Sequence, residues 1–380
     1  MRSLNDTLRR LSRLRNGAAI GGTAAPTEDR LSELVAFGSN PGALRGRFYL
    51  PRSGQAPAAL VVVLHGCTQD AAGYDHGSGW SRLADDQGFA LLYPEQQRGN
   101  NPNLCFNWFN ASDTRRDTGE ALSIRQMIAT MVAAHAIDPA RIFVTGLSAG
   151  GAMASVMLAT YPDVFAGGAI IAGLPYGTAA SMPEAFDRMR AHGGPPAAGL
   201  GALVTAASPH QGPWPTISIW HGDRDATVSY ANSALIVEQW RGLHDVAAEP
   251  DLVEQIDGHR RRAWQDAHGR AVIEEYRIGG LGHGTPLSTA GPDACGAAGA
   301  YMLEAGISST RRISDFWGLA TTTSGRRRNH DASPSSAPQS LSEAVPVEHR
   351  GTPTRPQPQR ASDGVGRIIE DALRTAGLMR

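Results

Sequence analysis

The sequence predicts an α/β fold in which a mostly parallel sheet is covered by helices on both faces. Short apolar, β-branched runs alternate along the chain with longer segments of helical periodicity, which is typical of such sheets. The run LVVVL at residues 60–64 is apolar on both faces, as a buried parallel strand must be. A length of 380 residues is enough for one large core with additional tails.

The individual elements follow from local patterns. Strands are expected where a short apolar run is bounded by turn residues, at residues 44–50, 59–64, 89–93, 141–145, 168–171, 216–220 and 272–278. Helices are expected where apolar residues recur every three or four positions, at residues 119–135, 149–159 and 230–243. The strand at 272–278 is more polar than the others, so we expect it at an edge of the sheet.

Composition divides the chain into four parts. Residues 1–40 are expected to form an N-terminal arm with a short basic helix, in which four leucines share one face. Residues 41–320 are expected to form the α/β domain. Residues 321–363 have almost no large apolar side chain and are expected to be a disordered linker. Residues 364–380 carry a small helical stripe and are expected to form a short amphipathic helix.

Charge and hydropathy exclude several classes of function. The 35 basic residues, all arginine, are balanced by 36 acidic ones, so the chain as a whole has no basic surplus for binding nucleic acid. A transmembrane helix is excluded because no apolar run reaches about 18 residues. The three cysteines, Cys67, Cys105 and Cys295, match no zinc motif, and two interpretations stay open: three buried thiols, or one disulfide and one free thiol.

The pattern Gly146-Leu147-Ser148-Ala149-Gly150 lies directly between an expected strand and an expected helix. In a G-x-S-x-G turn the serine occupies a strained strand-to-helix junction, and the crowded neighbouring positions must be glycine. A Gly-Ser loop without a function would seldom fall at such a junction. Ser148 is therefore the candidate nucleophile.

A serine nucleophile needs a histidine as base and a carboxylate that orients this histidine. The loop after strand 216–220 reads HGDRDATV, and we take Asp225 as the acid, with Asp223 as the alternative. His283 follows the last strand in a loop of four glycines, which let the backbone and the imidazole approach a crowded site. His283 is the candidate base.

The loop after the buried strand 60–64 is expected to complete an oxyanion hole. In hydrolases of this architecture one backbone N–H comes from this loop and the second from the residue after the nucleophile, which points to Cys67 and Ala149. His65 is expected to form structural hydrogen bonds. Histidines in polar stretches are expected to be exposed surface residues: His192, His210, His244, His259 and His268.

Four motifs together resemble the α/β-hydrolase esterases of the poly(3-hydroxybutyrate) depolymerase family: LHGCTQ at 64–69, GLSAGG at 146–151, HGxxD at 221–225 and GHG at 282–284. The resemblance runs from about residue 43 to residue 319. It implies the α/β-hydrolase fold and ester hydrolysis through an acyl-enzyme, with Ser148, Asp225 and His283 as the triad and Cys67 and Ala149 as oxyanion donors.

The resemblance also bears on the substrate. It implies a poly(3-hydroxybutyrate) polymer or oligomer, and, because it extends to feruloyl and acetylxylan esterases, such an ester or a generic short-chain ester is the alternative. Trp108 is expected to form an aromatic wall of the acyl groove, with a buried core tryptophan as the alternative. The segment 176–215 is expected to shape the acyl pocket. No metal or organic cofactor is implied.

Two further hypotheses assign the chain a different kind of function. The ends of the chain, at 4–14 and 366–379, suggest a protein that binds weakly to hydrophobic granules through amphipathic helices. A peptidase with the same triad is a further alternative. The N-terminus has no apolar stretch of the kind found in a Sec signal peptide, which favours the cytoplasm, whereas the family resemblance implies an extracellular enzyme.

Overall fold

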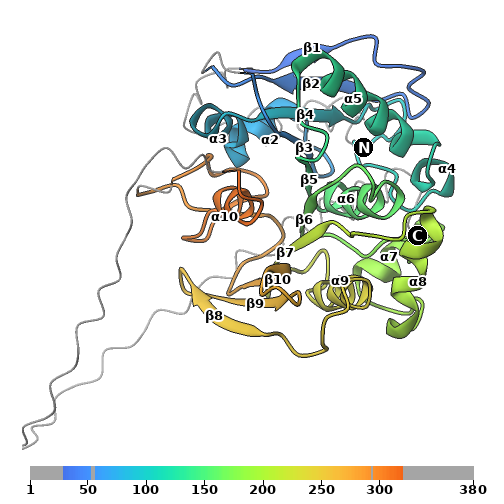
Figure 1. Ribbon diagram of the computed structural model, residues 1–380, viewed down its shortest axis with the longest axis vertical. Coiled ribbons are helices and arrows are strands. Elements are labelled where there is room, and N and C mark those ends of the chain that lie inside the picture. The colour runs from blue at the N-terminus through green and yellow to red at the C-terminus, as the bar shows by residue number, and fades with distance from the viewer. Residues whose placement is uncertain (1–28, 53–55, 292–293, 320–380) are drawn as a thin grey trace, which may run out of the picture.

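The computed structural model describes residues 29–52, 56–291 and 294–319 (Figure 1). The expected basic helix near the N-terminus, the linker at 321–363 and the helix at 364–380 lie outside the described residues. Within the described residues the main sheet has ten strands: β1 Ser32–Leu34, β2 Arg45–Tyr49, β3 Leu60–Leu64, β4 Ala90–Glu95, β5 Ile142–Leu147, β6 Gly167–Ile171, β7 Thr216–Gly222, β8 Leu252–Ile256, β9 His259–Gln265 and β10 Ala271–Ile278.

The remaining described elements are a small second sheet and the helices. The second sheet pairs β11 Thr285–Leu287 with β12 Met302–Glu304. The helices are α2 Ala71–Ser78, α3 Trp80–Gln87, α4 Ala111–Thr114, α5 Gly119–His135, α6 Ala149–Thr160, α7 Met182–Met189, η1 Ala197–Gly199, α8 Leu200–Ala207, α9 Ala231–Arg241 and α10 Ser309–Phe316. None of the helices in the described ranges is long and apolar enough to cross a bilayer.

The main sheet has the strand order β1-β2-β4-β3-β5-β6-β7-β10-β9-β8. The six strands from β4 to β10 in this order run parallel, and antiparallel strands extend the sheet at both edges. The register pairs Leu64 with Gly146, Leu147 with Ile171 and Gly222 with Ile278. The parallel strands therefore end at one edge, where their following loops meet.

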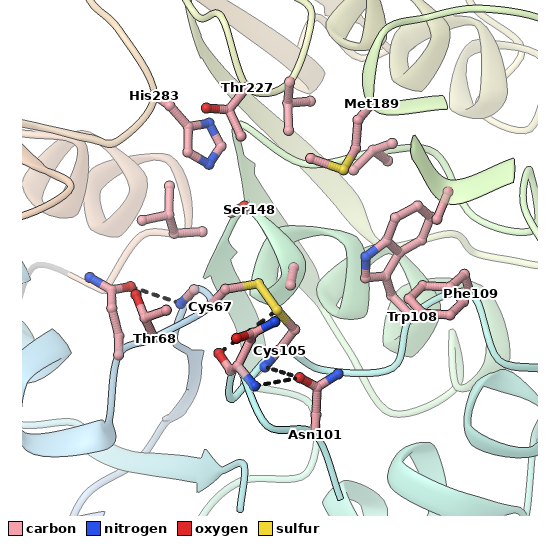
Figure 2. Close-up of a pocket in the computed structure, with 18 of the residues that line it drawn as sticks. Cys67, Thr68, Asn101, Cys105, Trp108, Phe109, Ser148, Met189, Thr227 and His283 are labelled. Atoms are coloured by element: carbon pink, nitrogen blue, oxygen red, sulfur yellow. Dashed lines mark hydrogen bonds between the residues drawn. A yellow bond between two sulfur atoms is a disulfide. The ribbon is translucent and has the colours of Figure 1, made fainter. Parts of the chain in front are cut away.

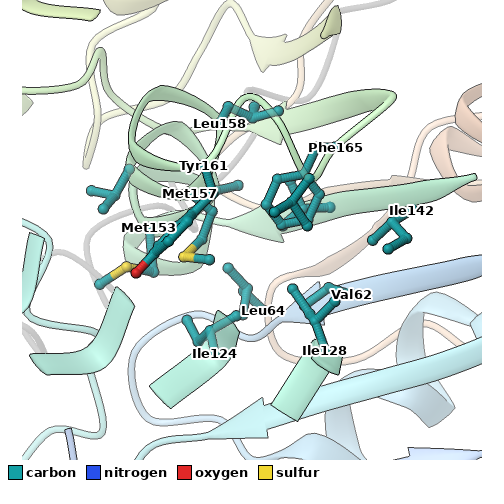
Figure 3. Packing of buried hydrophobic residues seen from close by; sticks show 14 of the residues in the cluster. Val62, Leu64, Ile124, Ile128, Ile142, Met153, Met157, Leu158, Tyr161 and Phe165 are labelled. Carbon is teal, nitrogen blue, oxygen red and sulfur yellow. The ribbon is translucent and has the colours of Figure 1, made fainter. Parts of the chain in front are cut away.

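Alternation along the strands builds a core on each face of the sheet. In β3, Leu60, Val62 and Leu64 join one cluster, and Val61 and Val63 join the other. Helices α5, α6, α8 and α9 cover the first face, and α2, α3 and α10 cover the second (Figure 1). Figure 3 shows side chains of α5 and α6 packed against β3 and β5. Every residue of α6 is buried, which explains its uniformly apolar and small-residue sequence.

The expectation that 272–278 is an edge strand is wrong. This strand, β10, lies between β7 and β9. Its acidic residues are buried because the neighbouring strand supplies partners: Arg261 Nε lies 2.7 Å from Glu274 Oε2, and Arg262 Nε lies 2.6 Å from Glu275 Oε2. Polar sequence suggested an edge, but ion pairs between strands allow the same residues to be internal.

The described part of the expected arm lies in the body of the protein. β1 pairs with β2 and forms an edge of the main sheet. Leu31, Leu34 and Phe37 are buried in the two cores. The boundary expected at residue 41 therefore falls inside the folded unit, which includes residues 29–40.

Candidate active site

Ser148 stands between β5 and α6 in a strained backbone conformation. Its φ and ψ are 58° and −118°, which few non-glycine residues adopt. The turn is held by the amide of Ser148, which donates to the carbonyl of Ile171 at 2.9 Å, and by the amide of Ala152, which donates to the carbonyl of Ser148 at 2.8 Å. The serine side chain reaches the cavity described below (Figure 2).

The flanking glycines are required by close backbone contacts. A Cβ on Gly146 would lie 2.3 Å from the carbonyl oxygen of Gly150. A Cβ on Gly150 would lie 2.3 Å from the carbonyl oxygen of Leu64 and 2.5 Å from that of His65. The turn therefore packs directly on the end of β3, which brings the 65–67 loop next to the serine.

Asp225 and His283 are brought together by the loops after β7 and β10. Asp225 Oδ2 lies 2.7 Å from His283 Nδ1, and Oδ1 accepts hydrogen bonds from the amides of Thr227 and Val228 at 2.8 and 2.9 Å. Burial alone raises the pKa of Asp225, but the hydrogen bonds from His221 and His283 outweigh it and hold the pKa well below its ordinary value. Asp225 is therefore ionised wherever the protein is folded near neutral pH.

Asp223, the alternative acid, does not reach the imidazole. Its carboxylate accepts from Arg277 Nη2 at 3.2 Å and from the amide of Gly280 at 2.8 Å, so it ties the loop after β7 to the loop after β10. Gly222 allows the same two loops to approach each other closely, since a Cβ there would lie 2.3 Å from the carbonyl oxygen of Leu281.

The loop after β3 presents Cys67 beside Ser148. Ala149 is the first residue of α6, so its amide has no carbonyl partner within the helix. Both residues line the cavity together with Ser148.

Cys67 forms a disulfide with Cys105, which decides between the two interpretations of the cysteines. Cys295 is the free, buried thiol, and burial raises its pKa to about 11.

His65 has the structural role expected for it. Its Nε2 accepts from the amide of Gln96 at 3.1 Å, so its Nδ1 carries the proton and donates to the carbonyl of Gly66 at 2.7 Å. Burial lowers the pKa of His65 and keeps the ring neutral.

Of the histidines expected at the surface, His192 and His268 are exposed, whereas His210, His244 and His259 are half-buried.

A cavity of about 180 Å³ adjoins Ser148 and His283. Trp108 is half-buried and lines it, as expected for an aromatic wall, while also packing against the core. Helix α7 also lines the cavity, with residues that recur at helical spacing: Met182, Ala185, Phe186 and Met189. Figure 2 shows Trp108 and Met189 on the side of the cavity away from His283. The pocket is therefore apolar and suited to an uncharged acyl chain.

Hydrogen bonds to Glu120, on α5, hold the loop that carries Cys105 and Trp108. Oε2 of Glu120 accepts from the amide of Asn107 at 2.9 Å, and its Oε1 accepts from the side chains of Asn107 and Gln96 at 2.8 and 2.6 Å. Burial raises the pKa of Glu120 to about 8. Sequence reasoning missed this residue because an acid at the start of a helix is ordinarily a dipole partner.

The sequence matches the profile of the family described as Esterase PHB depolymerase over residues 45–250. The chain is 47% identical to poly(3-hydroxyalkanoate) depolymerase C of Paucimonas lemoignei, over 76% of this chain and 70% of that protein. It is 30% identical to an acetylxylan esterase of Coprinopsis cinerea, over 68% of this chain and 70% of that protein. An acetyl xylan esterase structure from Aspergillus awamori has a TM-score of 0.64 at 22% identity, over 76% of this chain and 99% of that chain, which indicates a shared fold.

Proposed function

Because this chain belongs to the PHB depolymerase esterase family, we propose that it hydrolyses esters of 3-hydroxybutyrate, as polymer or oligomer, with Ser148, Asp225 and His283 as its triad. The chain is a carboxylic ester hydrolase of the α/β-hydrolase fold. The observation that carries the triad assignment is the 2.7 Å contact between Asp225 and His283 at the cavity that Ser148 also lines.

The proposed reaction proceeds through an acyl-enzyme. His283 Nε2 takes the proton from Ser148 as its Oγ attacks the ester carbonyl, and the protonated imidazole is stabilised by Asp225. His283 then gives this proton to the departing alkoxide. A water molecule then attacks the acyl-enzyme while His283 accepts its proton. The tetrahedral intermediate collapses to release the acid, and His283 returns this proton to Ser148 Oγ.

The amides of Cys67 and Ala149 are proposed to bind the oxyanion of each tetrahedral intermediate. Each such donor contributes about 3 kcal/mol to stabilisation of the transition state when the site is closed to water. The disulfide supports this role because it joins the donor loop to the loop that carries Trp108.

The lining of the cavity supports an aliphatic acyl group. Trp108, Phe186 and Met189 line the cavity with large, mostly apolar side chains. We propose Trp108 as a substrate-binding residue, whose replacement by Ala raises KM more than it lowers kcat. The test is a panel of amorphous poly(3-hydroxybutyrate), its soluble oligomers, feruloyl esters and short p-nitrophenyl esters, run beside Ser148→Ala. Release of 3-hydroxybutyrate by the wild type alone supports the proposal, and turnover of feruloyl esters only would contradict it.

A second candidate function is hydrolysis of acetylated or feruloylated sugar esters. The Coprinopsis cinerea relative at 30% identity favours it, and the same triad would serve. The two candidates differ in leaving group, since a sugar is far more polar than a hydroxyacid chain. Activity on acetylated xylan that exceeds activity on hydroxybutyrate oligomers would decide for this second function.

We propose that residues 29–319 form a single catalytic domain and that the protein acts in an oxidising compartment. A disulfide between Cys67 and Cys105 supports export, because thiols in the cytosol are kept reduced. Weak association with hydrophobic granules through the chain ends remains a proposal about residues outside the described ranges. It is tested by granule co-sedimentation of the full chain against a variant with both ends deleted, with soluble-ester activity measured in each.

A further inference from the structure

A second imidazole lies against the acid of the proposed triad. His221 is the penultimate residue of β7, and its side chain is fully buried. Its Nε2 lies 2.9 Å from the carbonyl oxygen of Val228 and 3.3 Å from Asp225 Oδ2. In the part of the chain that the structure describes, its Nδ1 has no hydrogen-bond partner.

These contacts require a proton on Nε2 of His221. A backbone carbonyl can only accept, so Nε2 must carry a proton, which it shares between Val228 and Asp225. This Nε2–H stabilises the carboxylate of Asp225.

The two oxygens of Asp225 are held in different ways. Oδ1 receives the amides of Thr227 and Val228, which belong to the same short loop. Oδ2 receives His283, which must move protons during the reaction, and His221, which sits on the sheet. His221 is thus the contact that ties Oδ2 to a rigid strand, and its bond to Val228 ties the loop to that strand as well.

We propose that His221 is a positioning residue, whose Nε2–H holds Asp225 Oδ2 and the Val228 carbonyl so that the carboxylate stays aligned with His283. The inference rests on the triad of the proposed function. Without this bond the carboxylate and the imidazole can tilt together, so His283 is a poorer base toward Ser148 and its protonated form is less well stabilised.

The other titratable groups near His221 are Tyr230, which contacts its ring, and two charged residues that contact Tyr230. Tyr230 packs edge-on at 5.8 Å between ring centroids. The hydroxyl of Tyr230 donates to Glu275 at 3.1 Å, and Arg277 lies over its ring at 5.3 Å. Glu275 and Arg277 thus reach the imidazole only through Tyr230, so a change in pH dependence on replacing His221 is attributed to its link with Asp225.

The test compares His221→Asn with His221→Gln. The amide nitrogen of Gln lies near the position of imidazole Nε2, whereas that of Asn reaches only as far as Nδ1, so only the Gln variant can place a donor at the Nε2 position. His244→Asn is the matched control, because His244 also binds a backbone carbonyl, that of Pro215 at 3.0 Å, without contacting Asp225. For each full-length variant, kcat, KM, Tm and the pH profile of kcat/KM are measured on a soluble ester.

We expect His221→Asn to lose roughly tenfold or more in kcat with KM changed by less than about twofold. The acid limb of its kcat/KM profile moves to lower pH by about half a unit or more, because the protonated form of His283 is less stabilised. His221→Gln recovers most of kcat and the wild-type limb. A purely structural role would lower Tm in both variants and leave the pH profile in place.

A folded His221→Asn variant with wild-type kcat and profile would overturn the inference, as would a folded His221→Gln variant as impaired as Asn. If the Asn variant does not fold, His221→Phe, which keeps a buried ring but has no N–H, takes its place and is judged by the same measures. Ser148→Ala is run in parallel: activity in that variant overturns the proposed triad, whereas an inactive Ser148→Ala beside a fully active His221→Asn overturns only the role of His221.

Discussion

The imidazole of His283 and the carboxylate of Asp225 meet at 2.7 Å although the two residues are 58 positions apart in the chain. Neighbouring parallel strands β7 and β10 end at the same edge of the sheet, and the loop after each strand contributes one of the two residues. The side chains are 7% and 0% exposed, so the contact is shielded from water. The carboxylate directs the Nδ1 proton toward itself and leaves Nε2 as the free base.

Asp225→Asn is expected to lower kcat by roughly 10⁴-fold while the protein stays folded, because an amide favours the wrong tautomer of His283. The measurement is kcat on a p-nitrophenyl ester with a thermal melt of the same sample. Asp223→Asn is the matched control, since Asp223 binds Arg277 and the amide of Gly280 and not the imidazole. We expect the control to lose less than about tenfold in kcat. Equal losses in the two variants would contradict the assignment of Asp225.

Gly150→Ala is expected to destabilise the fold by about 1–3 kcal/mol and to lower activity, because the new methyl group would press on the backbone at Leu64 and His65. Urea denaturation gives the change in the free energy of unfolding. Gly242→Ala is the control: this glycine has helical φ and ψ and nothing within 4 Å of an added Cβ, so the free energy of unfolding should hold or rise slightly. A Gly150→Ala variant as stable as the wild type would contradict the tight packing of the turn.

Loss of the Cys67–Cys105 disulfide is expected to lower both stability and kcat. The bond closes a loop across a sequence separation of 38, which corresponds to about 4 kcal/mol of chain entropy in the unfolded state. The double variant Cys67→Ser/Cys105→Ser is compared with the wild type by thermal melts and ester hydrolysis. Cys295→Ser controls for the loss of a thiol, and its kcat should stay close to that of the wild type. Undiminished kcat in the double variant would argue against Cys67 as an oxyanion donor that depends on this bond.

His244 is expected to make the fold less stable in acid. Burial lowers its pKa from 6.5 to about 4, so between these values the unfolded chain binds more protons than the folded one, and stability falls as pH falls. The loss across this window is at most about 3 kcal/mol. His244→Asn should show a shallower decline in the free energy of unfolding between pH 6.5 and pH 4 than the wild type does. His268→Asn, at an exposed position, should decline as the wild type does.

The parallel strands and the residues of the proposed triad could be identified from sequence because each depends on local pattern. A run such as residues 60–64 is a buried strand in almost any context, and Ser148 is marked by its own turn. The order Ser, Asp, His, with each residue after a strand, then follows from the fold. The sequence also favours Asp225 over Asp223 as the acid.

The remaining features depend on contacts between distant segments. Glu274 is internal because Arg261 of β9 neutralises it, which its own sequence does not reveal. Glu120 fixes the Trp108 loop across the structure. The sequence predicts that the segment 176–215 shapes the pocket, but which residues of α7 line it required coordinates. His221 could have been noticed because it follows the apolar part of β7 just before Gly222 and Asp225, but its contact with Asp225 required coordinates.

The central claim, that Ser148 is the nucleophile of an acyl-enzyme, is tested most directly by covalent trapping. The full-length protein is incubated with a fluorophosphonate, and the adduct is counted by intact mass and located by peptide mapping while residual ester hydrolysis is measured. We predict one adduct per chain, on Ser148, with activity lost in proportion, and neither labelling nor hydrolysis in folded Ser148→Ala. An adduct on another residue, or hydrolysis that persists in Ser148→Ala, would contradict the account.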